Sequence, residues 1–408
     1  MLWASGVDVK AWFKCIGCNN THPLEQDLLL CPVCGDLLEV EYDFNEIGAT
    51  AIFDVSNQLY VWKYRRLLPI SENSVIVSLN EGGTRLIRCV NIGRQLSLKE
   101  LYVKNEGDNP TGSFKDRGMT VGVTRAVQGK AKSVICASTG NTAASMSAYA
   151  ARAGLKAYVV VPESGVAKGK LLQSLVYGAT VILVSENFDS ALKRVLNSQG
   201  SGRAYLLNSV NPFRLEGQKT LAFEIYEQTH PTLPDKIFIP VGNGGNITAL
   251  WKGFRELSEL GLIERPPQII GVQAEGASPI VRAYEVGLNQ LQPVLNPTTY
   301  ASAIRIGSPV RWKEALEAIR RSNGVALAVS DTQIRQAQQL LARLEGVFVE
   351  PASAASLAGL IKLYNKGEVK SDERVVCVLT GNGLKDPESA HEIAAEPIKH
   401  TNIDDILF

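Results

Sequence analysis

The chain has 408 residues, which is too long for one small hydrophobic core and predicts at least two domains. Its 42 basic and 41 acidic residues leave a net charge of +1, so charge gives no indication of nucleic-acid binding. Apolar runs such as AYVVVP are the length of a strand and fall far short of a membrane span. The first ten residues lack a secretory pattern, and three isolated cysteines suit a reducing compartment, so we expect a cytoplasmic protein.

Two cysteine pairs, CIGC and CPVC, stand near the start of the chain with twelve residues between them. This spacing is typical of a zinc ribbon in which four thiolates surround a structural zinc ion. The predicted ligands are Cys15, Cys18, Cys31 and Cys34. The alternative is four reduced thiols in a module that binds no metal. His22 lies between the pairs and is expected in a turn before Pro23.

A singled-out lysine follows in the stretch NEGDNPTGSFKDRGM. Lys115 comes just after the turn-forming residues 109–112 and is flanked by Ser113, Asp116 and Arg117. A surface lysine needs no such setting, so the pattern suggests an amine held in a defined pose for chemistry. The alternative is a solvated lysine at a helix end.

From about residue 100 the chain alternates apolar strand-length runs with helix-like segments. The predicted strands are SVICAS, AYVVVP, TVILV, AYLLN, KIFIPV, QIIGVQA and RVVCVLT. The predicted helices include TAASMSAYAARAG, KGKLLQSLVYG, ALKRVLNSQG and ITALWKGFRELSEL. This alternation predicts an α/β fold with parallel sheets, whose ligand sites lie at the carboxyl ends of the strands.

Three of the predicted strands run into turns rich in glycine and hydrogen-bond donors. GNGGN, residues 242–246, precedes a helix and could bind a phosphate, but its spacing fits neither a dinucleotide nor a nucleoside triphosphate site. STGNTAAS, residues 138–145, offers hydroxyl groups and a helix start for a carboxylate, although Thr139 or Asn141 could simply cap the helix. TGNGLKD, residues 380–386, is the third.

A lysine combined with a phosphate-binding loop fits pyridoxal 5′-phosphate (PLP), since the amine can form a Schiff base while the loop anchors the phosphate. The chain resembles the threonine synthase family of the fold type II, tryptophan-synthase-β-like PLP enzymes. The motifs that carry the resemblance run over nearly the whole chain: EGGTRL, NPTGSFKDRG, STGNTAAS, NSVNPFRLEGQKT, VGNGGN, AEGASPIVRA, FVEPASAASLAG and LTGNGLKD. Arg85 in EGGTRL departs from the proline that relatives usually carry.

The resemblance implies a PLP-dependent lyase of threonine biosynthesis, a branch of the aspartate family of amino acids. The reaction would be γ-elimination and β-hydration of O-phospho-L-homoserine to L-threonine and phosphate. Lys115 would be the catalytic, cofactor-binding lysine. The other implied cofactor residues are Asn141, Gly242, Asn243, Gly244, Gly245, Asn246 and Thr380. The implied substrate residues are Ser138, Thr139 and Thr142 for the carboxylate, and Asn208, Ser209, Arg214 and Lys219 for the phosphate.

The resemblance also implies a domain division and a homodimer. Residues 1–45 would form a zinc-ribbon-like segment, residues 46–119 and 208–408 a large PLP-binding domain, and residues 120–207 a small domain that closes on substrate. Three alternatives remain open: a cysteate synthase, a serine/threonine dehydratase, and a zinc-ribbon binding module on an inactive enzyme scaffold.

Overall fold

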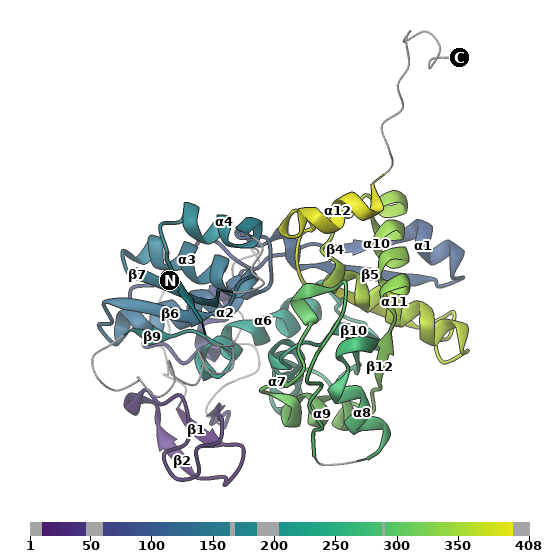
Figure 1. Ribbon diagram of the computed structural model, residues 1–408. Coiled ribbons are helices and arrows are strands. Elements are labelled where there is room, and N and C mark those ends of the chain that lie inside the picture. The colour runs from purple at the N-terminus through teal and green to yellow at the C-terminus, as the bar shows by residue number, and fades with distance from the viewer. Residues whose placement is uncertain (1–9, 46–59, 164–167, 186–203, 288–289, 395–408) are drawn as a thin grey trace, which may run out of the picture.

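The computed structural model describes residues 10–45, 60–163, 168–185, 204–287 and 290–394 of the chain. Within these ranges the strands form a three-stranded, a four-stranded and a six-stranded sheet (Figure 1). Among the helices of these ranges, none has the length and apolarity needed to cross a membrane.

The six-stranded sheet forms the centre of the larger part of the molecule. Its spatial order is β12 (Ala326–Val329), β11 (Gln268–Ala274), β10 (Lys236–Pro240), β13 (Arg374–Leu379), β5 (Glu100–Asn105) and β4 (Leu86–Arg88). All neighbouring strands run parallel except β4, which pairs antiparallel with β5 at the edge. The predicted parallel α/β sheet is therefore confirmed, with one antiparallel edge strand added.

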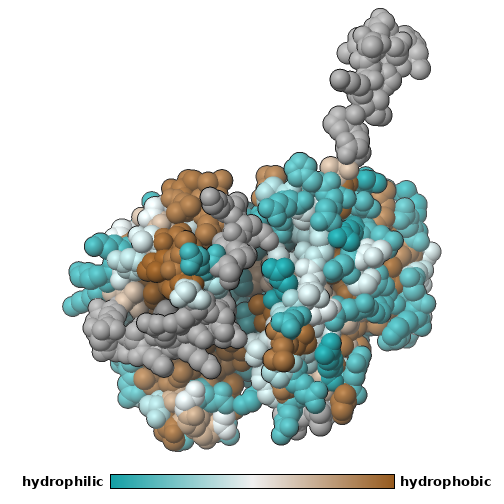
Figure 2. All heavy atoms as spheres, viewed as in Figure 1, coloured by the Kyte–Doolittle hydropathy of each residue, from teal (hydrophilic) through white to brown (hydrophobic). Residues whose placement is uncertain are grey.

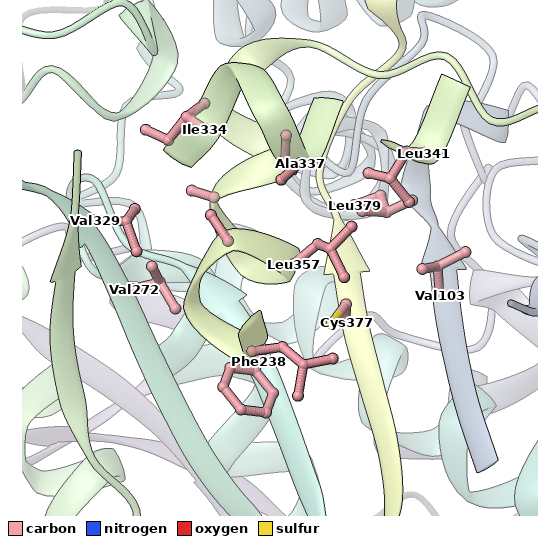
Figure 3. Close-up of a cluster of buried hydrophobic side chains, with 14 of the residues drawn as sticks. Val103, Phe238, Val272, Val329, Ile334, Ala337, Leu341, Leu357, Cys377 and Leu379 are labelled. Carbon is pink, nitrogen blue, oxygen red and sulfur yellow. The ribbon is translucent and has the colours of Figure 1, made fainter. Parts of the chain in front are cut away.

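Helices cover both faces of this sheet, which explains why its central strands β10, β11 and β13 consist mostly of apolar residues. Along β13, Val375 and Cys377 belong to one core cluster and Val376 and Val378 to the other, because successive side chains point to opposite faces. The first face carries α1 (Val90–Gln95), α10 (Asp331–Glu345) and α11 (Pro351–Asn365). The second carries α6 (Pro212–Thr229), α7 (Gly245–Glu259), α8 (Pro279–Glu285) and α9 (Trp312–Arg321). Figure 3 shows Leu357 and Leu341 from the first set packed over the sheet residues.

The four-stranded parallel sheet is formed by residues inside the predicted small domain. Its spatial order is β8 (Thr180–Val184), β7 (Lys156–Pro162), β6 (Ser133–Ala137) and β9 (Tyr205–Leu206), and its helices are α2 (Lys115–Gln128), α3 (Asn141–Ala153) and α4 (Lys168–Val176). Helix α2 begins before residue 120 and continues beyond it, so no element ends at that boundary. The predicted helix ALKRVLNSQG lies outside the described residues.

Local sequence explains where several helices begin and end. Helix α10 starts with a capping box, in which Ser330 accepts from the Gln333 backbone and the Gln333 side chain accepts from Ser330. Asn211 caps α6, and the proline after it suits the first helical position. Gly154 ends α3 in the left-handed conformation that glycine adopts without strain.

The N-terminal segment forms the three-stranded sheet of β1 (Ala11–Cys15), β2 (Thr21–Pro23) and β3 (Leu38–Tyr42). Its core packs against α6, where the rings of Phe13 and Phe213 lie 5.5 Å apart. His22 lies in β2 rather than in the expected turn, because β2 pairs antiparallel with β1. The remaining described α-helix, α12 (Pro387–Ile393), follows the third glycine-rich turn.

Candidate functional site

A cavity of about 1490 Å³ lies between the two parallel sheets, where the space-filling view shows the surface hollowed (Figure 2). The three glycine-rich turns follow β6, β10 and β13, and all three line this cavity together with Lys115. Ligands of open α/β folds bind at such carboxyl ends of parallel strands. The structure thus brings together segments that lie far apart in the sequence, from Thr111 to Glu388.

The residues beside Lys115 hold it in place. Lys115 is the first residue of α2. The Asp116 carboxylate accepts hydrogen bonds from the backbone N–H of Thr111 at 2.7 Å and from its hydroxyl at 2.6 Å. The Arg117 guanidinium is fully buried and pairs with Glu106 at 2.6 Å. The charged side chains of Asp116 and Arg117 therefore fix the turn, and the backbone that carries Lys115 is held rigidly.

The amine of Lys115 is unusually acidic for a lysine. Burial, reinforced by the positive charge of Arg214, lowers its pKa to about 7, although Glu350 acts in the opposite direction. A lysine with such a lowered pKa has a free lone pair near neutral pH, which a nucleophile needs to attack a carbonyl.

Attachment of PLP to cofactor-free protein is expected to depend on pH with a midpoint near 7. Because the neutral amine reacts and the ammonium does not, the attachment rate falls by about tenfold per unit below the midpoint and levels off above it. Arg214→Met removes the neighbouring charge and should move the midpoint to higher pH. Stopped-flow absorbance between pH 5.5 and 9 measures the midpoint of the wild type and that of Arg214→Met. A midpoint near that of an ordinary lysine, about 10, would contradict the assignment.

The loop of residues 242–246 has the geometry of an anion-binding site. Gly244 adopts a φ of 86° and directly precedes α7, whose first N–H groups have no partner within the helix. A Cβ at Gly244 would lie 2.6 Å from the carbonyl oxygen of Arg311, so only glycine fits. The Asn246 amide nitrogen is buried without a hydrogen-bond partner. The loop therefore offers backbone and side-chain donors to a phosphate.

The turn after β6 lines the opposite side of the cavity. It contributes Ser138, Thr139 and Thr142 together with the first turn of α3. Asn141 donates from its amide to both carboxylate oxygens of Glu350, at 3.0 and 3.2 Å. This contact joins the small-sheet side of the cavity to the N-terminus of α11.

Thr380 lies where β13 enters the cavity. Its hydroxyl is 3.1 Å from the hydroxyl of Ser353, which also accepts from the backbone N–H of Gly381 at 2.8 Å. A neutral hydroxyl here, rather than a carboxylate, would leave a pyridine nitrogen unprotonated.

Arg214 is the clearest unmatched charge in the cavity. Its side chain is 1% exposed, and its Nε and Nη1 atoms have no hydrogen-bond partner. Burying an unpaired guanidinium costs several kcal/mol, roughly, so such a group normally has an anion beside it. Arg214 therefore fits the expectation of a bound phosphate.

Of the other three predicted phosphate ligands, two line the cavity and Lys219 does not. Asn208 and Ser209 both line the cavity, but the Asn208 amide accepts from the backbone N–H of Ala137 at 2.9 Å and donates to its carbonyl at 2.8 Å, so it is tied to the end of β6. Lys219 is not brought to the cavity: its fully buried amine pairs with Glu216 and Glu256, at 2.6 and 2.8 Å.

Helix geometry explains the separation of Lys219 from Arg214. Residues five apart on a helix point about 140° away from each other, whereas residues four apart share a face. Gln218, four residues after Arg214, accordingly lines the cavity. The helical period of the sequence could have identified this residue in place of Lys219.

Two further residues of the cavity did not emerge from the sequence. Glu350 lies within the motif FVEPASAASLAG, but only the fold places it against Asn141. Lys385 donates to the Thr111 carbonyl at 2.9 Å and to Gln173 of α4. Arg85 is 69% exposed, forms an ion pair with Asp108 and does not line the cavity, so its departure from the family pattern lies outside the site.

The four N-terminal cysteines form a separate cluster. Their sulfur atoms all lie within 4.8 Å of one another, and the Cys15–Cys34 and Cys18–Cys31 pairs are 3.4 and 3.7 Å apart. Four thiolates around zinc stand about 3.8 Å apart, given Zn–S bonds of about 2.3 Å. The donor set therefore fits a structural zinc ion.

Purified protein is expected to contain about one zinc ion per chain, because four thiolate ligands complete its coordination. Elemental analysis of protein prepared without chelators measures this. Cys31→Ser should lower the zinc content while leaving PLP bound, since the cluster does not line the cavity. Zinc-free wild-type protein would contradict the prediction.

Known proteins similar to this chain agree with the geometry. A family model described as pyridoxal-phosphate dependent enzyme matches residues 77–381. The threonine synthase of Methanocaldococcus jannaschii is 53% identical over 95% of this chain and 96% of its own length. That of Methanosarcina acetivorans is 48% identical over 96% of this chain and 97% of its own.

Solved structures share the fold. The diaminopropionate ammonia lyase of Escherichia coli superposes with a TM-score of 0.67 at 15% identity, covering 78% of this chain and 88% of its own. The processed form of threonine deaminase isoform 2 from Solanum lycopersicum superposes with a TM-score of 0.64 at 22% identity, covering 76% of this chain and 87% of its own. With a matching family model over most of its length and relatives near 50% identity, this chain belongs to the pyridoxal-phosphate-dependent enzymes and, among them, to the threonine synthase family.

Proposed function

We propose that this protein converts O-phospho-L-homoserine and water to L-threonine and phosphate. One observation carries the proposal: a half-buried lysine with a lowered pKa lines the same cavity as a buried arginine that has no hydrogen-bond partner on two of its nitrogens. The first suits a carbonyl cofactor and the second a phosphate ester. The names of the relatives support the same reaction.

The residues present fit PLP. Lys115 would bond to it, the donors of residues 242–246 would hold its phosphate, and Asn141 and Thr380 would contact its ring substituents. When bound, PLP supplies an electron sink for carbanions. Lys115 Nζ, with a pKa of about 7, can accept a proton from the substrate Cα and return it near neutral pH.

The substrate would be held at both ends. Ser138, Thr139 and Thr142 would bind its carboxylate through hydroxyl and backbone donors. Arg214 and Ser209 would bind its phosphate, which stabilises the charge that grows on the departing group. Lys219 has no place in this assignment, because both of its partners are carboxylates.

The test is release of phosphate and formation of threonine from O-phospho-L-homoserine, in equal amounts. Parallel assays with phosphoserine plus sulfite and with serine or threonine alone test the cysteate synthase and dehydratase alternatives. Sulfite-dependent phosphate release, or ammonia release from serine, without activity on phosphohomoserine would overturn the proposal.

The division into a large domain and a small closing domain of residues 120–207 is part of this proposal. It is supported by the separate four-stranded sheet, which lines the side of the cavity that would bind the carboxylate. A phosphonate analogue of the substrate should compact the protein, because only the closed form satisfies both sets of donors. Small-angle scattering with and without the analogue measures this, and identical profiles would count against closure.

We further propose a cytoplasmic homodimer, on the resemblance alone. Sedimentation equilibrium measures the mass in solution, and localisation of a tagged chain tests the compartment. A monomer at working concentration would contradict the proposed homodimer.

A further inference from the structure

Arg311 lies between the two loops that the proposed function assigns to phosphate groups. It directly precedes α9 and is 0% exposed, which makes it one of the largest fully buried side chains of the described residues. A buried guanidinium needs hydrogen-bond partners for its donors, so the partners of Arg311 show which segments it holds together.

The backbone of Arg311 packs against the loop of residues 242–246. Its N–H donates to the carbonyl of Asn243 at 3.0 Å. Its own carbonyl oxygen faces Gly244 so closely that a Cβ there would come within 2.6 Å. Any shift of Arg311 would therefore be transmitted to the turn from which α7 starts.

The side chain of Arg311 contacts the second loop. Nε donates to the carbonyl of Ser209 at 2.9 Å, and Nη2 donates to the carbonyl of Val210 at 3.4 Å. Nη1 pairs with Glu314 at 2.7 Å, which fixes the plane of the guanidinium. Arg311 also acts on Arg214 in the cavity. Burial lowers the pKa of Arg214 to about 10, and the positive charge of Arg311 contributes to this decrease.

We infer that Arg311 is a positioning residue that sets the spacing between the loop of residues 242–246 and the loop of residues 208–210. The inference rests on the proposed function, in which these loops bind the cofactor phosphate and the substrate phosphate. The rigid fork of an arginine presents separate nitrogens to the two carbonyls and to Glu314, whereas a lysine would have to make all three contacts from the single nitrogen of a flexible chain. Loops that bind anions through backbone groups depend on such fixed placement.

Binding of PLP and of pyridoxal, which lacks the phosphate, to cofactor-free Arg311→Lys tests this. PLP affinity should fall by about tenfold to hundredfold, as is usual when a residue that orients a binding site is replaced. Pyridoxal affinity should change by less than about twofold, because its bond to Lys115 does not use the loop. The control is Lys313→Met, which removes an exposed ion pair with Asp36 beside Arg311 and should leave both affinities unchanged.

Equal weakening of PLP and pyridoxal, or no weakening of either, in folded Arg311→Lys would overturn the inference. If that variant does not fold, Glu314→Ala replaces it, since it frees the guanidinium to leave the two carbonyls. A selective loss of PLP affinity of several-fold then supports the inference, and its absence contradicts it. These measurements use no substrate, so they stay decisive if the protein fails to act on phosphohomoserine.

Discussion

Replacement of Lys115 by alanine is expected to abolish turnover and the visible absorption of protein-bound PLP together. The absorption arises from a covalent bond to a lysine, and Lys115 combines a half-buried side chain, a pKa of about 7 and a position in the cavity. The activity loss should exceed about a thousandfold, since both the attachment of the cofactor and the proton transfer at the substrate Cα use this amine. Absorbance spectra before and after borohydride reduction, with the phosphate-release assay, measure the effect.

The matched control is Lys385→Met, which removes the second lysine that the described residues place in the cavity wall. This amine already donates to the Thr111 carbonyl and to Gln173, so the absorption band should persist in the variant. A reducible band in Lys115→Ala, or its loss in Lys385→Met alone, would assign the cofactor to a different lysine.

Replacement of Arg214 by methionine is expected to lower activity while maintaining or raising stability. In the absence of an anion two of its nitrogens are buried and unpaired, so an apolar side chain of similar length removes a cost of folding. With the phosphorylated substrate the same change removes a charge-assisted contact. We expect kcat/KM to fall by about a hundredfold, which corresponds to roughly 2.7 kcal/mol, mostly through KM.

Urea unfolding and initial rates separate the two effects. Arg117→Met is the matched control, because this arginine is equally buried but pairs with Glu106 and Glu224, at 2.6 and 2.7 Å. Breaking a buried pair costs about 3–5 kcal/mol, so Arg117→Met should be strongly destabilised. In addition, phosphate should raise the midpoint of unfolding of the wild type and not that of Arg214→Met. A destabilised Arg214→Met with unchanged KM would show that Arg214 is structural.

Much of the architecture followed from local patterns. Apolar runs of strand length alternating with helical segments predicted the parallel sheets, and the bounds of β7 and α3 agree with the predicted runs to within one residue at each end. Backbone conformation and hydrogen bonding are local properties, so residues such as Gly154 and Ser330 mark helix ends in the sequence itself.

The candidate site was predictable where its residues lie in short motifs, and less so where it depends on pairing. Lys115, the turn at Ser138 and the loop of residues 242–246 were predicted from the sequence, and all of them line one cavity. The antiparallel edge strand β4 was not predicted, because three residues carry too little pattern.

By itself the sequence determined the fold class, the candidate lysine, the glycine-rich loops and the cysteine cluster, since each depends on residues close together in the chain. Only the tertiary structure decided which charges are paired. Arg214 and Lys219 are both cations on one helix. The amine of Lys219 forms ion pairs with two carboxylates, whereas two nitrogens of Arg214 have no hydrogen-bond partner. The partners come from distant segments, as when Arg311 reaches Ser209, and burial then sets the energy of each charge. Those are properties of the packed chain, because neither distance nor solvent exclusion exists before it folds.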